Sequence, residues 1–146
     1  MFKNTFITML GIAIHCTLFA GQIENRIEAE KFDRSKGVGI KEISGGKAVN
    51  NFSEGKWIQF NEMNMSGITS ITFRAASGST GSTVKLEVRM DSDKGKVLGT
   101  IDVPVQGWSK FQEITMPIAS ASGKNNLVLV SAKSGILLDW IQLNTK

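Results

Sequence analysis

The sequence predicts an all-β domain, built as an antiparallel β-sandwich. Three observations favour this fold class. Apolar and polar residues alternate along several short segments, turn-forming residues recur about every ten residues, and no long segment shows the apolar period of a helix. Because an alternating strand buries only one of its faces, such strands form sheets that stack around a shared core.

The expected strands follow from this alternation, taken in chain order. The pattern is clearest in residues 84–90, where Val84, Leu86 and Val88 alternate with charged residues. Polar, glycine-containing turns separate the strands in the second half of the chain. The strands that we expect are 26–30, 70–75, 84–90, 97–103, 111–118, 126–132 and 136–143, and the turns are 76–82, 91–96, 122–125 and 133–135.

Three carboxylates in the first and last strands form a candidate metal site. Glu28 and Glu30 would project from the same face of an extended strand, because successive side chains alternate. Asp139 lies in the last apolar strand, where a charge is costly unless it is paired or coordinated. If these strands pair, the three groups could hold a hard cation such as Ca²⁺. The alternative is three solvated strand charges, because Ca²⁺ takes about six to eight oxygen ligands.

The N-terminal segment, residues 1–20, is typical of a secretory signal peptide. Lys3 gives it a positive start, residues 6–18 are mostly apolar, and Ala20 supplies a small residue for cleavage. The apolar run is too short for a membrane span. Cys16 leaves a lipidated N-terminus as the alternative. We therefore expect a protein that is secreted to the extracellular space or the periplasm.

The composition of the mature domain, residues 21–146, excludes several classes of function. The only Cys and the only His both lie in the signal segment, so neither a disulfide nor a Ser-His-Asp triad is possible. Loss of Lys3 lowers the formal net charge from +4 to +3, and the basic residues are scattered, which argues against nucleic-acid binding. A glycosidase with two carboxylates remains a minor alternative, although Glu28 and Glu30 are neighbours on one strand. We expect no enzymatic activity.

A series of short motifs follows in order along nearly the whole mature chain. They are Ile27-Glu28-Ala29-Glu30, Gly45-Gly46, Gly55-Lys56-Trp57-Ile58-Gln59-Phe60, Phe73-Arg74-Ala75-Ala76-Ser77, Leu98-Gly99-Thr100, Gly107-Trp108 and Leu138-Asp139-Trp140. In this order the chain resembles the family-6 carbohydrate-binding modules. The resemblance implies a galactose-binding-like jelly roll that binds polysaccharide or oligosaccharide without chemistry. It also implies a structural Ca²⁺ on Glu28, Glu30 and Asp139, with backbone oxygens around Gly46 and Lys47.

The resemblance assigns Trp108 to one wall of a clamp around a sugar ring. The apolar C–H face of a sugar stacks on a flat side chain, while its hydroxyls need fixed polar partners. The alternative for Trp108 is a loop anchor packed on the core. The second aromatic wall has no match, because residues 35–44 hold no aromatic residue and the chain has no Tyr. Leu137 replaces the Asn that usually precedes the Leu-Asp-Trp motif.

A second binding surface on the concave face of a sheet is also implied by the resemblance. Trp57 and Arg74 are candidate residues there, together with Lys85, Glu87 and Arg89. A solvated sheet face explains these charges equally well. The leading hypothesis is a secreted sugar-binding module. The alternative is a protein-interaction or envelope-structural domain that has lost the clamp and binds another secreted or envelope protein.

Overall fold

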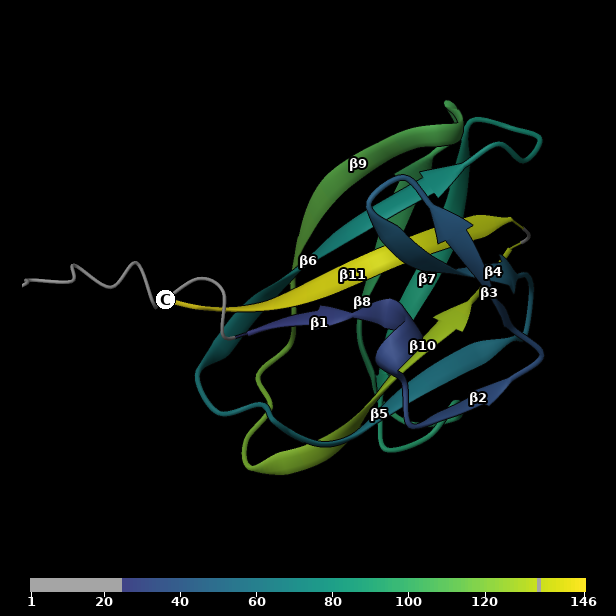
Figure 1. Ribbon diagram of the computed structural model, residues 1–146. Coiled ribbons are helices and arrows are strands. Elements are labelled where there is room, and N and C mark those ends of the chain that lie inside the picture. Colours follow the sequence, from purple (N-terminus) through teal and green to yellow (C-terminus); the bar gives the residue numbers. More distant parts are fainter. Residues whose placement is uncertain (1–24, 134) are drawn as a thin grey trace, which may run out of the picture.

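The computed structural model describes residues 25–133 and 135–146, and it confirms the predicted all-β architecture (Figure 1). The signal segment, with Cys16, lies outside the described residues, so both signal-peptide cleavage and lipidation stay untested. The elements in chain order are β1 (Arg26–Glu28), the 3₁₀ helix η1 (Ala29–Lys31), β2 (Arg34–Lys36), β3 (Gly39–Ile43), β4 (Gly46–Phe52), β5 (Trp57–Asn64), β6 (Ile68–Ser77), β7 (Thr83–Met90), β8 (Val97–Pro104), β9 (Gly107–Pro117), β10 (Lys124–Ser131) and β11 (Ile136–Thr145).

The strands form two antiparallel sheets that enclose the core. The first sheet has the order β3-β4-β11-β6-β9, with β1 also paired to β11, and the second has the order β2-β5-β10-β7-β8. Ile27 lies opposite Ile141, and Glu28 lies opposite Trp140, in the β1–β11 pair. Figure 1 shows β1 running beside β11. The expectation that the first and last strands lie together is therefore confirmed.

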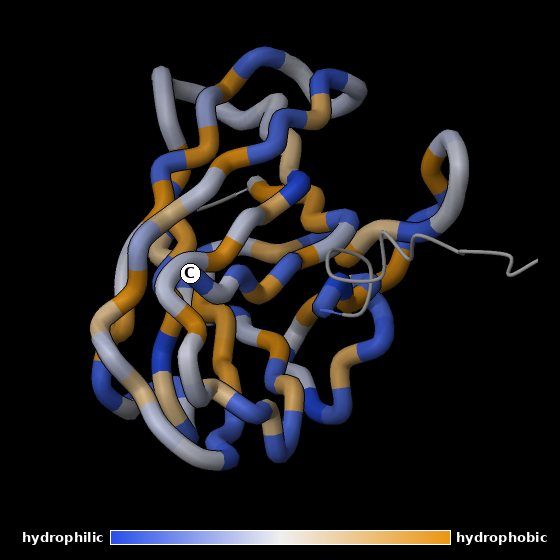
Figure 2. The backbone as a smooth tube through the Cα atoms, turned by 90° about the vertical axis from the view of Figure 1, so that its left-hand side faces the viewer, coloured by the Kyte–Doolittle hydropathy of each residue, from blue (hydrophilic) through white to orange (hydrophobic). Residues whose placement is uncertain are grey.

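The core between the sheets is formed by the alternating apolar residues. Val84, Leu86 and Val88 on β7 are buried, as the pattern predicts, and Phe73 on β6 is fully buried between the sheets. Figure 2 shows hydrophobic and hydrophilic residues alternating along the strands. Because each large apolar side chain contributes about 1.5–3 kcal/mol on full burial, this core supplies most of the stability of the domain.

Two parts of the structure differ from the expected strands. The extended strand predicted through Glu30 ends at Glu28, and η1 follows it, so Glu28 and Glu30 do not lie on one strand face. Strands β2, β3, β4 and β5 were not predicted. β2 is exposed throughout and most of β3 is exposed at an edge of the first sheet, while β4 and β5 bury consecutive rather than alternating residues. A strand without a buried face leaves no alternating pattern in the sequence.

Candidate functional site

Trp108 lies on the surface, at the beginning of β9, with 47% of its area exposed. Its indole ring rests on two glycines from neighbouring segments. A Cβ atom on Gly78 would lie 2.5 Å from the indole Cδ1 and Nε1, and one on Gly135 would lie 3.1 Å from Cη2. The absence of side chains at these positions makes room for the ring. Trp108 is therefore an exposed, supported platform, and the alternative of a core anchor does not fit this position.

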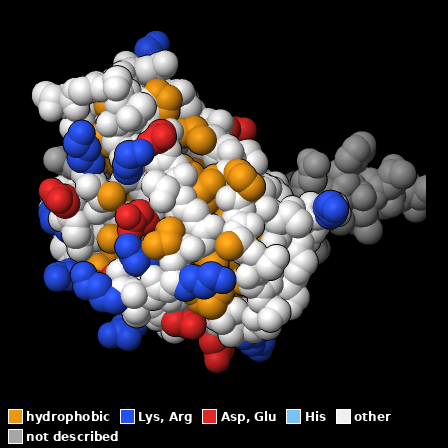
Figure 3. All heavy atoms as spheres, turned by 180° about the vertical axis from the view of Figure 1, so that it is seen from behind, with side chains coloured by type: hydrophobic (Ala, Val, Ile, Leu, Met, Phe, Trp, Pro, Cys, Tyr) orange, Lys and Arg blue, Asp and Glu red, His pale blue; other side chains and the backbone are white. Residues whose placement is uncertain are grey.

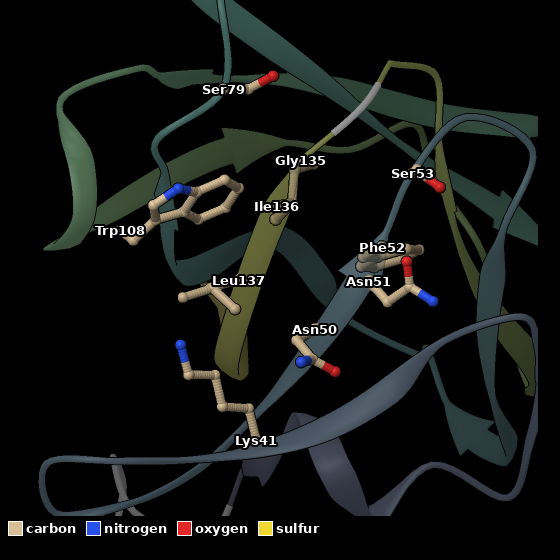
Figure 4. Close-up of a pocket in the computed structure, with 10 residues that line it drawn as sticks. All are labelled: Lys41, Asn50, Asn51, Phe52, Ser53, Ser79, Trp108, Gly135, Ile136 and Leu137. Atoms are coloured by element: carbon tan, nitrogen blue, oxygen red, sulfur yellow. The ribbon is translucent and has the colours of Figure 1, made fainter.

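A cavity of about 460 Å³ lies beside this platform, at the outer face of the first sheet (Figure 4). Its wall is contributed by β3, β4, β9, β11 and the segment after β6. Figure 4 shows the indole of Trp108 on one side of the cavity and the side chain of Lys41 reaching towards Leu137 and Trp108. The lining residues are Lys41, Asn50, Asn51, Phe52, Ser53, Ser79, Trp108, Gly135, Ile136 and Leu137.

A β-bulge in β4 shapes the floor of the cavity. Ile136 pairs with Phe52 and Leu138 pairs with Val49, so two residues, Asn50 and Asn51, lie opposite the single residue Leu137. Bulges of this kind re-aim side chains next to functional sites.

Both asparagines of the bulge make local contacts. Asn51 has a φ of 53°, a left-handed conformation that Asn tolerates better than most residues, and its Nδ2 donates a hydrogen bond of 3.2 Å to the Gly37 carbonyl. Asn50 lies against Gly39, where a Cβ atom would be 2.6 Å from its Oδ1. The bulge therefore brings carboxamides to the cavity beside the apolar side chain of Leu137.

The missing second aromatic wall leaves room for Lys41. The segment 35–44 lines this cavity only through Lys41, which projects from β3. The side chain is exposed and makes no ion pair with any residue that the structure describes. The site therefore combines one aromatic plate with a flexible cation, where the resemblance implies a pair of aromatic plates.

Arg74 and Trp57 do not share a surface, so their predicted common binding face is wrong. Arg74 lies on β6 in the first sheet, and Trp57 lies on β5 in the second. The Arg74 guanidinium is ion-paired with Asp139 and lies 4.6 Å from the centre of the Phe111 ring. Arg74 also lines a cavity of about 350 Å³ that adjoins the Trp108 site.

The outer face of the second sheet carries Trp57 among paired charges. Trp57 is half-buried and lies opposite Lys36 and Val130. Beyond β10 in the same sheet, on β7 and β8, the Arg89 Nε atom lies 2.8 Å from Glu87 Oε2, and the Lys85 Nζ atom lies 2.7 Å from Asp102 Oδ1. Because these charges are neutralised by one another, this arrangement favours a solvated sheet face over a second ligand site.

The three predicted metal-binding carboxylates meet in one cavity of about 480 Å³. Glu28, Glu30 and Asp139 line it together with residues 44–47, although η1 rather than a continuous strand positions Glu30. The buried Oε2 atom of Glu30 has no hydrogen-bond partner among the described residues. A buried carboxylate oxygen without a donor is costly, and a bound cation would satisfy it.

Basic partners already engage two of these carboxylates. Asp139 is ion-paired with Arg74, and Glu28 lies 3.5 Å from the Arg26 Nε atom. Within residues 25–133 and 135–146, no group of acidic side chains is drawn together closely enough to form a ready-made metal site. The donors are oxygen atoms and suit Ca²⁺, and Arg74 engages only the Oδ2 atom of Asp139.

On one face of the described part of the chain (Figure 3), the charges do not gather into a basic patch that would suit nucleic acid. On the face seen in Figure 3, acidic and basic side chains lie among one another. No helix in the described part of the chain is both long and apolar enough to cross a membrane.

The sandwich fold, with an exposed Trp beside a surface cavity, is that of a carbohydrate-binding module. The family model for carbohydrate binding module (family 6) matches residues 28–145, and the chain therefore belongs to this family. This membership confirms the resemblance inferred from the motifs.

Relatives and solved structures agree with this assignment. Endo-1,4-beta-xylanase A of Thermoclostridium stercorarium is 32% identical over 109 residues, which cover 71% of this chain and 16% of that enzyme. A family 6 module of Clostridium stercorarium, solved with cellobiose, aligns with a TM-score of 0.75 at 25% identity over 83% of this chain and 93% of that chain. A β-1,3-glucan-binding family 6 module of Bacillus halodurans aligns with a TM-score of 0.74 at 26% identity over 82% and 95%. The chain thus spans a small part of the curated relative.

Proposed function

We propose that the cavity beside Trp108 is the saccharide-binding site of this module and that the chain carries out no catalysis. The observation that carries the proposal is the exposed indole on its glycine bed, at the edge of a cavity of about 460 Å³. The flat ring would stack on the apolar face of a sugar, and Asn50, Asn51 and Ser79 offer hydrogen-bonding groups for its hydroxyls.

The solved relatives suggest which ligands to test first. One similar module is solved with cellobiose, and another binds β-1,3-glucan. We propose a polysaccharide or oligosaccharide of extended form as the ligand. A glycan array on the mature protein, followed by calorimetric titration of the best ligands, would test this. Because one wall of the clamp is missing, the titration should extend to millimolar concentration. Absence of binding at that concentration would contradict the proposal.

We further propose that the cavity at Glu28, Glu30 and Asp139 holds a structural Ca²⁺. The unpartnered Glu30 oxygen supports this, as do residues 44–47 at the same cavity. The cation would tie β1 and η1 to β11. The domain has no cysteine within residues 21–146, so no disulfide replaces such a cross-link.

Secretion to the extracellular space or the periplasm is proposed from the signal-like segment of residues 1–20.

The second candidate function is a protein-interaction or envelope-structural domain. Leu137 in place of a polar residue and the absence of a second aromatic wall favour it. Trp57 remains a secondary candidate for sugar contact, although the charges on β7 and β8 of the same sheet are paired. A negative glycan array with a captured protein partner would support this second function.

A further inference from the structure

The charge of the Trp108 cavity is unbalanced. Its lining contains one charged side chain, Lys41, and no carboxylate among the described residues. The next residue along β3, Glu42, lines the adjoining cavity and lies 3.7 Å from the Lys47 ammonium. The cation in that adjoining cavity, Arg74, is neutralised by Asp139. Lys41 is therefore the one cation of the combined surface that has no ion-pair partner within residues 25–133 and 135–146.

The position of Lys41 directs its charge to a ligand on Trp108. Lys41 pairs with Ala48 on the cavity face of β4, and its amine reaches towards Leu137 and the indole (Figure 4). A lysine stem can pack along an apolar floor while its ammonium stays at the rim. A sugar ring stacked on the indole would present an edge substituent to this ammonium.

An anionic substituent fits this edge better than a hydroxyl. Charge-assisted hydrogen bonds to carboxylate or sulfate oxygens are shorter and stronger than neutral ones. An acidic residue nearby would repel such a ligand, and the cavity lining has none. A neutral sugar hydroxyl also accepts a hydrogen bond from an ammonium, but without the added attraction between opposite charges.

We propose that this site selects a saccharide unit that bears an anionic group, either a uronate carboxylate or a sulfate ester, and that Lys41 binds that group. The inference rests on the proposed function of the Trp108 cavity and adds the ligand class. The positive formal net charge of the mature domain, +3, favours the approach of a polyanionic chain as well.

The test compares matched ligands by calorimetry at low ionic strength. One pair is an oligogalacturonate and its methyl ester, and the other is a sulfated galactan oligosaccharide and its desulfated parent. The acidic member of at least one pair should bind about threefold to tenfold more tightly, since the ammonium is exposed. This preference should shrink as salt rises, and the two pairs distinguish carboxylate from sulfate.

Two variants separate local from overall charge. Lys41→Gln should abolish the preference for the acidic ligand and leave the affinity for its neutral partner within about twofold. Lys124→Gln removes the same charge from β10 in the second sheet, where the exposed Lys124 has no ion pair among the described residues, and should leave the preference intact. Both variants should melt as the parent does, because both side chains are exposed.

Each other outcome has a distinct meaning. Equal affinity for acidic and neutral ligands, or an equal loss of both in Lys41→Gln, would overturn the inference and leave the proposed sugar site standing. Loss of the preference in Lys124→Gln as well would show a general charge effect and would also overturn it. Failure of every saccharide to bind the parent protein would reject the proposed function itself.

Discussion

Truncation of Trp108 to alanine separates a ligand platform from a structural residue. A buried aromatic residue costs about 3–5 kcal/mol of stability when it is truncated to Ala. Trp108 keeps 47% of its area exposed, so about half of that cost, roughly 1.5–2.5 kcal/mol, is expected. For a domain of this size the melting temperature should fall by roughly 5–10 °C.

Trp108→Ala should also weaken ligand binding, by an amount that the loss of stability does not predict. Loss of the exposed indole face removes about 1–3 kcal/mol of apolar burial on binding, which corresponds to a roughly fivefold to 150-fold weaker affinity. Calorimetric titration of the variant below its melting temperature measures this directly. Trp108→Phe keeps a smaller plate and should give an intermediate affinity.

Phe73→Ala serves as the internal standard for a core residue. Phe73 is fully buried on the core side of β6. Its truncation to alanine should lower the free energy of unfolding, measured by chemical denaturation, by about 3–5 kcal/mol. If Trp108→Ala costs as much as Phe73→Ala, the platform interpretation is refuted. The same holds if the affinity for a saccharide that the parent binds does not change.

Three further predictions concern the glycine bed, the bulge and the metal. Gly78→Ala places a Cβ atom 2.5 Å from the indole, so the ring must shift; binding and Trp fluorescence should change while the β circular-dichroism spectrum stays. Gly39→Ala places a Cβ atom 2.6 Å from Asn50 Oδ1. Because that carboxamide can move, the free energy of unfolding should change by under about 1 kcal/mol, while the ligand affinity should fall, as it should in Asn50→Ala. An unchanged ligand affinity in both variants would exclude Asn50 from the site. Chelation should lower the melting temperature, and Ca²⁺ but not Mg²⁺ should restore it. At a hundred times its dissociation constant, Ca²⁺ should add about 2.7 kcal/mol to the free energy of unfolding. Glu30→Gln should lose this response, and identical melting of calcium-loaded and verified metal-free protein would contradict the calcium site.

Strands with two distinct faces, such as β7, could be predicted from sequence, whereas the largely exposed strands β2 and β3 could not. Residues 84–90 show the alternation because β7 has one buried and one solvated face. β2 and β3 bury little, so their residues follow no period. The η1 turn at Ala29–Lys31 escaped for a related reason, because the alternation of two glutamates suits either a strand or a short turn.

The candidate site was predictable in its aromatic residue but not in its polar ones. Trp108 follows a glycine and fits a family motif, so its role could be proposed in advance. Asn50 contributes through a bulge in the pairing of β4 with β11, a register that local sequence does not encode. Lys41 belongs to the site because its side chain on β3 lines the same cavity. Arg74 was placed on the wrong face because sequence alone does not say which sheet a strand joins.

The central position of β11 has a consequence for how the chain folds. The first sheet places β11, the last strand in chain order, between β4 and β6, and β1 adds to it as well. Strands β1, β4 and β6 are synthesised before β11, so the first sheet cannot form its central pairs until β11 has been made. Such distant pairing slows folding, and it keeps an emerging chain unfolded for longer. By the same geometry, truncation before Ile136 would split the sheet at its middle rather than trim its edge.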